Sequence, residues 1–176
     1  MKSALFDVRI IYSIFKKNYE LPFLLKQYMM KSLFDQEAYA EIRTRIDALS
    51  ENSERQWGKM TAGQMLRHCQ APLNIILEKE DYGFKPNWLI NLLFKKSMYS
   101  DKLWKKGLPT AKPLKETEPR VFTKEKTTLE NLLDELHSQR DREEWAPHPA
   151  FGKFTKEQYG KMQYKHLDHH LRQFGV

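Results

Sequence analysis

Apolar residues recur every three or four positions along most of the chain, which is the spacing of amphipathic helices. The first clear stripe follows Asp35, a residue type that favours the N-cap, and consists of Ala38, Ile42, Ile46 and Leu49. No segment alternates with period two over any length, and β-branched residues are sparse. The pattern therefore predicts an all-α protein.

Two capping signals mark the starts of further helices. Residues 61–64 and 155–158 both read Thr-x-x-Gln. In this pattern each side chain accepts a hydrogen bond from the other residue's backbone N–H, which satisfies two free donors at a helix start. The first signal predicts a helix to about Lys79, and the second predicts a last helix to about Phe174.

Two more helices are expected between these signals. One begins near Asn87, and another carries four leucines on one face between positions 129 and 136. Prolines and a glycine within residues 107–120 predict a long irregular connection. Together the elements predict an antiparallel four-helix bundle with one long crossover and an N-terminal extension.

The first thirty residues differ from the rest, and they divide the chain into an extension, 1–30, and a helical domain, 31–176. Apolar residues between positions 10 and 15 have helical spacing. Charged Asp7 and Arg9 interrupt the apolar core that a secretory signal requires. We expect a segment packed on the domain, with a helix lying on a membrane surface as the alternative.

Composition narrows the class of protein. The chain has 176 residues, of which 40% are hydrophobic and 30% charged, a balance typical of one globular domain. No apolar run approaches the roughly 18 residues of a membrane span. The single Cys69 excludes an internal disulfide and a cysteine-based zinc finger, and it favours a reducing, cytoplasmic location.

The chain is basic, with a formal net charge of +7. The excess lies in the first thirty residues and in five lysines between positions 95 and 106, while opposite charges alternate elsewhere as on solvated helix faces. No RNA-recognition strand, zinc finger or arginine-rich block accompanies this charge, so we expect no nucleic-acid partner.

Histidines on two predicted helices are the strongest candidates for chemistry. His166 and His170 lie about 40° apart around the axis of the last helix, so their rings can point at one metal ion. His68 lies on the apolar side of an earlier helix, where a buried imidazole needs a partner. Three histidine ligands leave positions open for water or substrate, which is the pattern of catalytic sites.

Alternatives remain for each of these assignments. As an alternative to a metal site, the two histidines mark the polar, half-exposed end of the last helix. His169 is the other choice for the second metal ligand on that helix. His148, between two prolines, is either a turn residue or a group that reaches over the site. Gln173, one turn beyond His170, is expected to contact a metal-bound water or a substrate. No carboxylate is expected beside the three histidines.

Four other residues carry expectations about packing. His137 is expected on the surface, and Cys69 is expected in the core. Pro72 has no N–H to bond the carbonyl of His68, so we expect the helix to bend there. The bend is either a kink tolerated by the packing or a feature that aims His68 at the last helix. Gly160 costs a helix about 1 kcal/mol relative to alanine, which predicts a close approach by a helix or a ligand.

Three segments of the chain resemble the DinB/YfiT-like metalloprotein superfamily, and most of all its branch described as a DinB-like domain of unknown function. The segments are Gln-Trp-Gly-Lys-Met-Thr with the following Gln-Met-Leu-Arg-His (56–68), His-Pro-Ala-Phe-Gly (148–152) and His-Leu-Asp-His-His-Leu-Arg-Gln-Phe-Gly (166–175). The resemblance covers about residues 32–176. It implies a four-helix bundle that binds a divalent metal, zinc or nickel, through His68, His166 and His170.

The resemblance also implies a metal-dependent enzyme. Members of the superfamily include transferases and isomerases that use a low-molecular-weight thiol, and others are described as hydrolases. Many are homodimers, and their substrates are small molecules. The alternative is a non-catalytic helical protein that binds a metal or a partner; a sealed site would favour this alternative, whereas an open cavity would favour an enzyme.

Overall fold

The computed structural model describes residues 30–176, and the expectations for residues 1–29 lie outside this range. Over the described range the chain is all-helical and has no strand, as the sequence predicts. None of the described helices is both long and apolar enough to cross a membrane. The elements, in chain order, are α3 (Gln36–Asp47), α4 (Ala62–Ile76), α5 (Trp88–Tyr99), the 3-10 helix η1 (Lys112–Leu114), α6 (Phe122–Ser138) and α7 (Lys156–Gln173).

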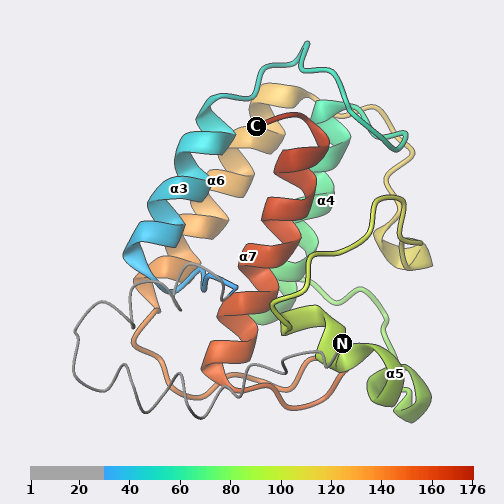
Figure 1. The fold of residues 1–176 in the computed structure, drawn as a ribbon, viewed down its shortest axis with the longest axis vertical. Helices are drawn as coiled ribbons and strands as arrows, with labels where there is room; N and C mark the ends of the chain where they lie inside the picture. Colours follow the sequence, from blue (N-terminus) through green and yellow to red (C-terminus); the bar gives the residue numbers. More distant parts are fainter. Residues whose placement is uncertain (1–29) are drawn as a thin grey trace, which may run out of the picture.

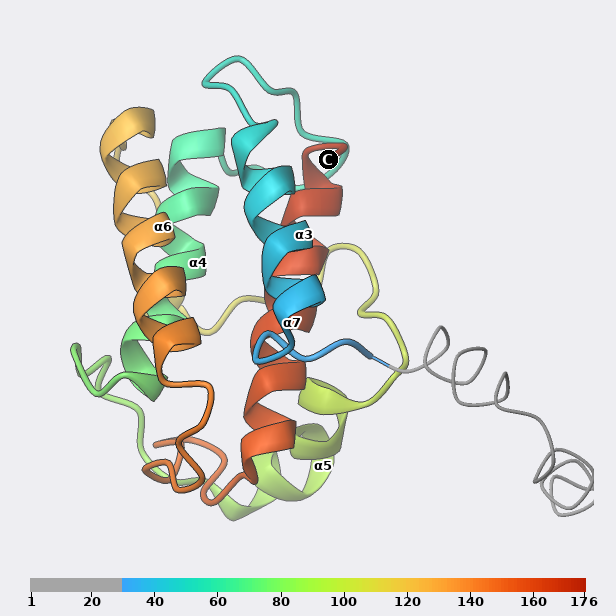
Figure 2. The ribbon, with the colours of Figure 1, turned by 90° about the vertical axis from the view of Figure 1, so that its left-hand side faces the viewer.

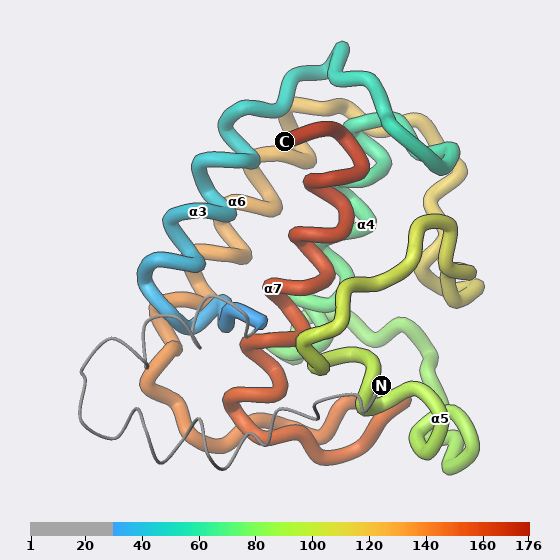
Figure 3. The backbone as a smooth tube through the Cα atoms, in the orientation of Figure 1, coloured from blue at the N-terminus to red at the C-terminus, as the bar shows by residue number. Residues whose placement is uncertain are grey.

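The four helices α3, α4, α6 and α7 lie side by side as a bundle, and α5 lies outside it at one end (Figures 1 and 2). In Figure 1, α3 and α7 run upward while α4 and α6 run downward. The connection between α4 and α6, residues 77–121, therefore returns along the whole bundle and carries α5 and η1 (Figure 3). The predicted four-helix bundle with one long crossover is confirmed.

Both predicted capping boxes are formed. The Thr61 side chain accepts a hydrogen bond from the backbone N–H of Gln64, and the Gln64 side chain accepts one from Thr61 in return, at 3.3 and 2.9 Å. Thr155 and Gln158 form the same pair of bonds at 3.2 and 3.0 Å. These caps fix the starts of α4 and α7, the two helices that carry the candidate ligands.

The other helix ends agree only in part with those predicted from the sequence. Asn87 caps α5 as expected, through bonds from two backbone N–H groups. Asp35 occupies the N-cap of α3, but its side chain makes no cap hydrogen bond. α4 ends at Ile76 and not near Lys79, because Glu78 has a φ of +58°, a left-handed conformation that a right-handed helix cannot continue through.

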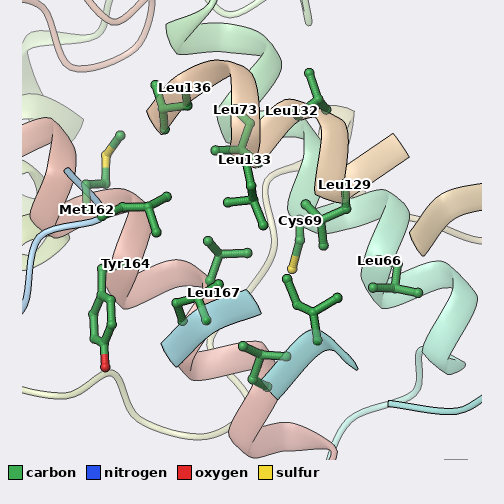
Figure 4. Packing of buried hydrophobic residues seen from close by; sticks show 14 of the residues in the cluster. Leu66, Cys69, Leu73, Leu129, Leu132, Leu133, Leu136, Met162, Tyr164 and Leu167 are labelled. Carbon is green, nitrogen blue, oxygen red and sulfur yellow. The ribbon is translucent and has the colours of Figure 1, made fainter. Parts of the chain in front are cut away.

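The leucine stripe of α6 forms the centre of the hydrophobic core. Leu133 and Leu136 are fully buried, and they pack in the same cluster as Leu73 of α4 and Leu167 of α7 (Figure 4). Full burial of a side chain of this size stabilises the fold by about 1.5–3 kcal/mol. Cys69 lies in this core, as predicted, and burial raises the pKa of its thiol.

The expectation that His137 lies on the surface is wrong. Its ring is buried, stacks on Tyr39 at 4.1 Å between centroids and lies 2.9 Å from the side-chain oxygen of Gln36. The last turn of α6 packs against the start of α3, which covers a histidine that the sequence places at the end of an amphipathic helix.

The close approach predicted at Gly160 is confirmed, although its partner is the segment before α3. The backbone N–H of Leu33 donates to the carbonyl of Gly160 at 3.0 Å. A Cβ at Gly160 would collide with Ser32 and Phe34. The glycine thus lets residues 32–34 cross α7 at short range.

Candidate metal centre

Three buried histidines from two antiparallel helices converge across the bundle. His68 of α4 faces His166 and His170 of α7, and one ring nitrogen of each lies within 4.8 Å of the others. The Nε2 atoms of His68 and His166 are 3.1 Å apart. Two zinc ligands in a tetrahedral site lie about 3.3 Å apart when each bond is about 2.0–2.1 Å long. The spacing of this pair of nitrogens is therefore close to that of two ligands of one ion.

Hydrogen bonds orient two of the three rings. His68 Nδ1 donates to the carbonyl of Leu114 at 2.9 Å. His170 Nδ1 donates to Oε1 of Gln173 at 2.9 Å, and the amide of Gln173 is held in turn by its bond to the carbonyl of Trp57 at 2.7 Å. Because Nδ1 carries the proton in both neutral rings, Nε2 has a free lone pair for a metal ion.

The third ring completes the set without such support. His166 Nδ1 is buried and has no hydrogen-bond partner among residues 30–176. Its Nε2 lies against Nε2 of His68, and the lone pair of the His68 nitrogen points toward it. Three imidazoles whose nitrogens converge in this way are a donor set that suits zinc and nickel.

Burial keeps these imidazoles neutral. It lowers the pKa of His68, and it lowers the pKa of His166 well below the ordinary histidine value. Burial and the neighbouring His68 lower the pKa of His170 to about 3. A histidine binds a metal only when it is deprotonated, so near neutral pH all three rings are in the state that a ligand requires.

A cavity of about 330 Å³ opens onto the three histidines. Half of the lining residues come from the crossover, and the walls are largely apolar. Its aromatic and aliphatic lining includes Phe84, Ile90, Met98, Trp104, Leu108, Pro109, Leu114 and Phe151. Among the described residues that line it there is no aspartate or glutamate, and the polar groups are five histidines, Lys85 and Thr110. An open cavity of this kind distinguishes the site from a sealed structural one.

His148 reaches the cavity from the loop before α7. Its Nδ1 accepts a hydrogen bond from the backbone N–H of Ala150 at 3.1 Å, so the neutral ring carries its proton on Nε2. Burial lowers the pKa of His148 to about 4. A bridge of two backbone hydrogen bonds between His148 and Gly152 fixes this loop. His148 is thus a neutral hydrogen-bond donor positioned at the cavity.

His169 lines the cavity but does not belong to the converging trio. Its ring lies edge-on between Trp57 and Trp104, at 5.7 Å from each ring centroid. Its Nδ1 is buried without a partner in the described part of the chain, and burial lowers its pKa. Gln173 supports His170 through a hydrogen bond, as a residue that acts on a ligand from behind, and it does not line the cavity where contact with a water or a substrate was expected.

The carboxylate of Asp168 points away from the three histidines. Asp168 lies between His166 and His170 in the sequence but accepts hydrogen bonds from Arg45 at 3.0 Å and from Arg172 at 2.9 Å on the other side of α7.

Pro72 lines the cavity beside His68, and α4 continues past this proline. Its carbonyl accepts a hydrogen bond from Gln163 of α7 at 3.0 Å, which ties together the two ligand-bearing helices.

The residues that cover the site were not predicted from the sequence. Trp104, in the crossover, lies 5.9 Å from the ring of His166, and its Nε1 donates to the carbonyl of Ser97 at the end of α5. The buried ammonium of Lys165 donates to the same carbonyl at 2.8 Å. The signal that the sequence offers for this contact is a tryptophan between lysines in an irregular connection.

Comparison with known proteins gives a family but no function. Residues 29–175 match the family described as Protein of unknown function (DUF1569). Searches of curated proteins and of solved structures gave no match.

Proposed function

The chain belongs to the DUF1569 family, and we propose that it is a metal-dependent enzyme whose ligands are His68, His166 and His170. The observation that carries this proposal is the position of the three imidazoles on the wall of an open cavity. A structural metal site is closed by protein ligands, whereas a catalytic site keeps a position that a small molecule can reach.

A divalent ion in such a site supplies Lewis-acid chemistry, by which a water molecule or a thiol loses a proton near neutral pH. The protein's own contribution is binding and orientation. The apolar walls of the cavity exclude water from a bound substrate, and they favour a substrate with a compact apolar body. Of the described residues that line the cavity, none is a carboxylate that would act as a general base.

His148 and His169 are the cavity histidines outside the proposed ligand set. The Nε2–H group of His148 is available to donate a hydrogen bond to a substrate oxygen, because Nδ1 is occupied by the backbone of Ala150. Its low pKa keeps the ring neutral, so we assign it a role in orienting the substrate and not in proton transfer. His169 faces the same cavity between two tryptophans, where it contacts a substrate edge-on.

The resemblance to the DinB/YfiT-like superfamily supports the same assignment and narrows the reaction. We propose either transfer of a low-molecular-weight thiol or hydrolysis, with zinc or nickel as the metal. Since no described residue places a carboxylate on the cavity wall, chemistry centred on the metal is favoured in both cases. We propose a homodimer from this resemblance, and a cytoplasmic location from the single Cys69, which favours a reducing compartment.

The test is the metal content of purified protein, measured by elemental analysis after exposure to zinc or nickel and removal of excess ion. Wild-type protein is expected to retain one ion per chain. His170→Ala is expected to lose most of it, whereas His169→Ala, with a histidine removed from the adjacent position, is expected to retain it. A wild-type chain that stays metal-free, or the opposite behaviour of the two variants, would contradict the proposal.

The reaction is then tested on metal-loaded protein. Thiol consumption in the presence of electrophilic substrates and hydrolysis of esters and amides are measured in parallel, with His170→Ala as the inactive control. Turnover that requires both the metal and His170 supports the enzyme; a metal-loaded chain without either activity favours the non-catalytic alternative.

A further inference from the structure

Helix α5 is the most apolar of the described α-helices, yet most of its residues are exposed. It contains no buried residue. Trp88 is 77% exposed, Leu92 is 70% exposed and Leu93 is 61% exposed. The other large apolar side chains exposed here are Leu89, Ile90, Phe94, Leu103 and Leu108. A soluble helix normally buries its apolar stripe, so a surface of this size indicates an interaction site.

The segment that contains α5 and its flanking residues carries most of the formal net charge of the chain. Residues 82–110 contain six lysines and one acidic residue, Asp101, which gives a net charge of +5. Lys85, Lys96 and Lys102 are exposed around the apolar side chains. Apolar side chains flanked by lysines are the composition of surfaces that lie in the interface of anionic membranes, where the apolar groups enter the acyl region and the lysines meet the headgroups.

We propose that α5 and residues 100–110 form a docking surface for an anionic lipid bilayer. Charge selects this occupant over two others. A second copy of the chain would bring two surfaces of charge +4 together, since α5 and residues 100–110 contain five lysines and one aspartate, and residues 1–29, with five basic and two acidic side chains, would add further positive charge. Each of these contacts is opposed by like-charge repulsion, whereas a bilayer with anionic headgroups neutralises the lysines.

The shape and position of the surface agree with this occupant. α5 lies outside the four long helices at one end of the molecule, where a flat partner can reach it (Figures 1 and 2). Ile90 and Leu108 are exposed on the docking surface and also line the cavity. The docking surface is therefore continuous with the cavity wall, although docking itself requires neither the metal nor catalysis.

The test is cosedimentation of the full chain with vesicles of phosphatidylcholine containing phosphatidylglycerol, compared with vesicles of phosphatidylcholine alone. The full chain is expected to bind the anionic vesicles about tenfold more tightly, and more weakly as salt is raised. Trp88→Ser with Leu92→Ser is expected to weaken this binding about tenfold, because both side chains lose their contact with the acyl region. Lys96→Gln with Lys102→Gln is expected to remove most of the preference for anionic lipid.

The matched control is Val121→Ser with Lys124→Gln, which changes one exposed apolar residue and one exposed lysine at the start of α6. This variant should bind like the wild type. All variants are compared by thermal unfolding, and because the substituted side chains are exposed, their unfolding temperatures should agree.

Three results would overturn the proposal. If the serine variant and the glutamine variant of the docking surface both bind vesicles as the wild type does, the contact lies in residues 1–29. A wild-type dimer that binds no vesicles and dissociates in Trp88→Ser with Leu92→Ser would show that a second copy covers α5. A monomer that binds no anionic vesicles would show that the surface serves another partner.

Discussion

Helix α4 has two contrasting neighbours. Toward α6 it packs leucines such as Leu66 and Leu73 against the leucine stripe of that helix (Figure 4). Toward α7 it presents His68 to two further histidines beside a cavity. The first interface stabilises the fold by burying apolar surface, and the second buries polar rings at a cost that hydrogen bonds offset in part and that the proposed metal ion would offset further. Stability and the proposed chemistry therefore lie on opposite sides of one helix, and they can be perturbed separately.

The largest effect is expected from the leucine interface. Leu133→Ala should lower the free energy of unfolding by about 2–5 kcal/mol, because it removes buried methyl groups and leaves a cavity. Urea denaturation measures this loss. Leu92→Ala, at an exposed leucine of α5, is the matched control and should change stability by less than about 0.5 kcal/mol. Folded Leu133→Ala should still bind one metal ion; loss of the ion would show that the two sides of α4 are coupled.

The histidine interface should respond in metal affinity. Gln173→Ala removes the acceptor that orients His170, and it should weaken metal binding by about 10–100-fold. The control is Gln163→Ala, which removes another buried glutamine of α7 whose partner is the carbonyl of Pro72 and not an imidazole. Calorimetric titration with zinc compares the two. Equal losses in both variants would mean that Gln173 acts only through packing.

Acid should destabilise the metal-free protein through its buried neutral histidines. The folded-state pKa of His148 is about 4, below the ordinary value of 6.5, so between these values the unfolded chain binds a proton that the folded chain does not. Stability is complete above pH 6.5 and falls as the pH drops toward 4, by up to about 1.4 kcal/mol per pH unit for each such group. His148→Gln should flatten this fall in chelated protein; an unchanged slope would show that His148 does not contribute.

The smallest effect on the bundle is expected from the extension. Removing residues 1–29 should leave a cooperatively folding domain, because residues 30–176 contain an extensive hydrophobic core of their own. Differential scanning calorimetry compares the shortened and full chains. Loss of the unfolding transition in the shortened chain would place part of the core in the extension, and the proposed domain boundary would be wrong.

The sequence predicted the parts of the structure that depend on local pattern. The Thr-x-x-Gln boxes fix the starts of α4 and α7, and the leucine stripe fixes the buried face of α6. The spacing of His166 and His170 placed their rings on one side of α7. Each of these features needs only the geometry of a single helix.

The remaining features depend on contacts between segments far apart in the sequence. His137 is buried because the start of α3 covers it, and Trp104 reaches the site because the crossover folds back along the bundle. Gln173 turns to His170 because the carbonyl of Trp57 holds its amide. α5 shows the converse, since its apolar residues predict a helix but do not reveal that the bundle leaves that helix exposed.

X-ray absorption spectroscopy of the zinc-loaded protein tests the central claim most directly, because it counts the ligands of the metal and identifies their atoms. We expect three imidazole nitrogens at about 2.0–2.1 Å, together with at least one light atom from solvent. The His170→Ala protein should show fewer imidazoles at the zinc that it retains. A sulfur ligand at about 2.3 Å, or fewer than three imidazoles in the wild type, would contradict the assignment of His68, His166 and His170.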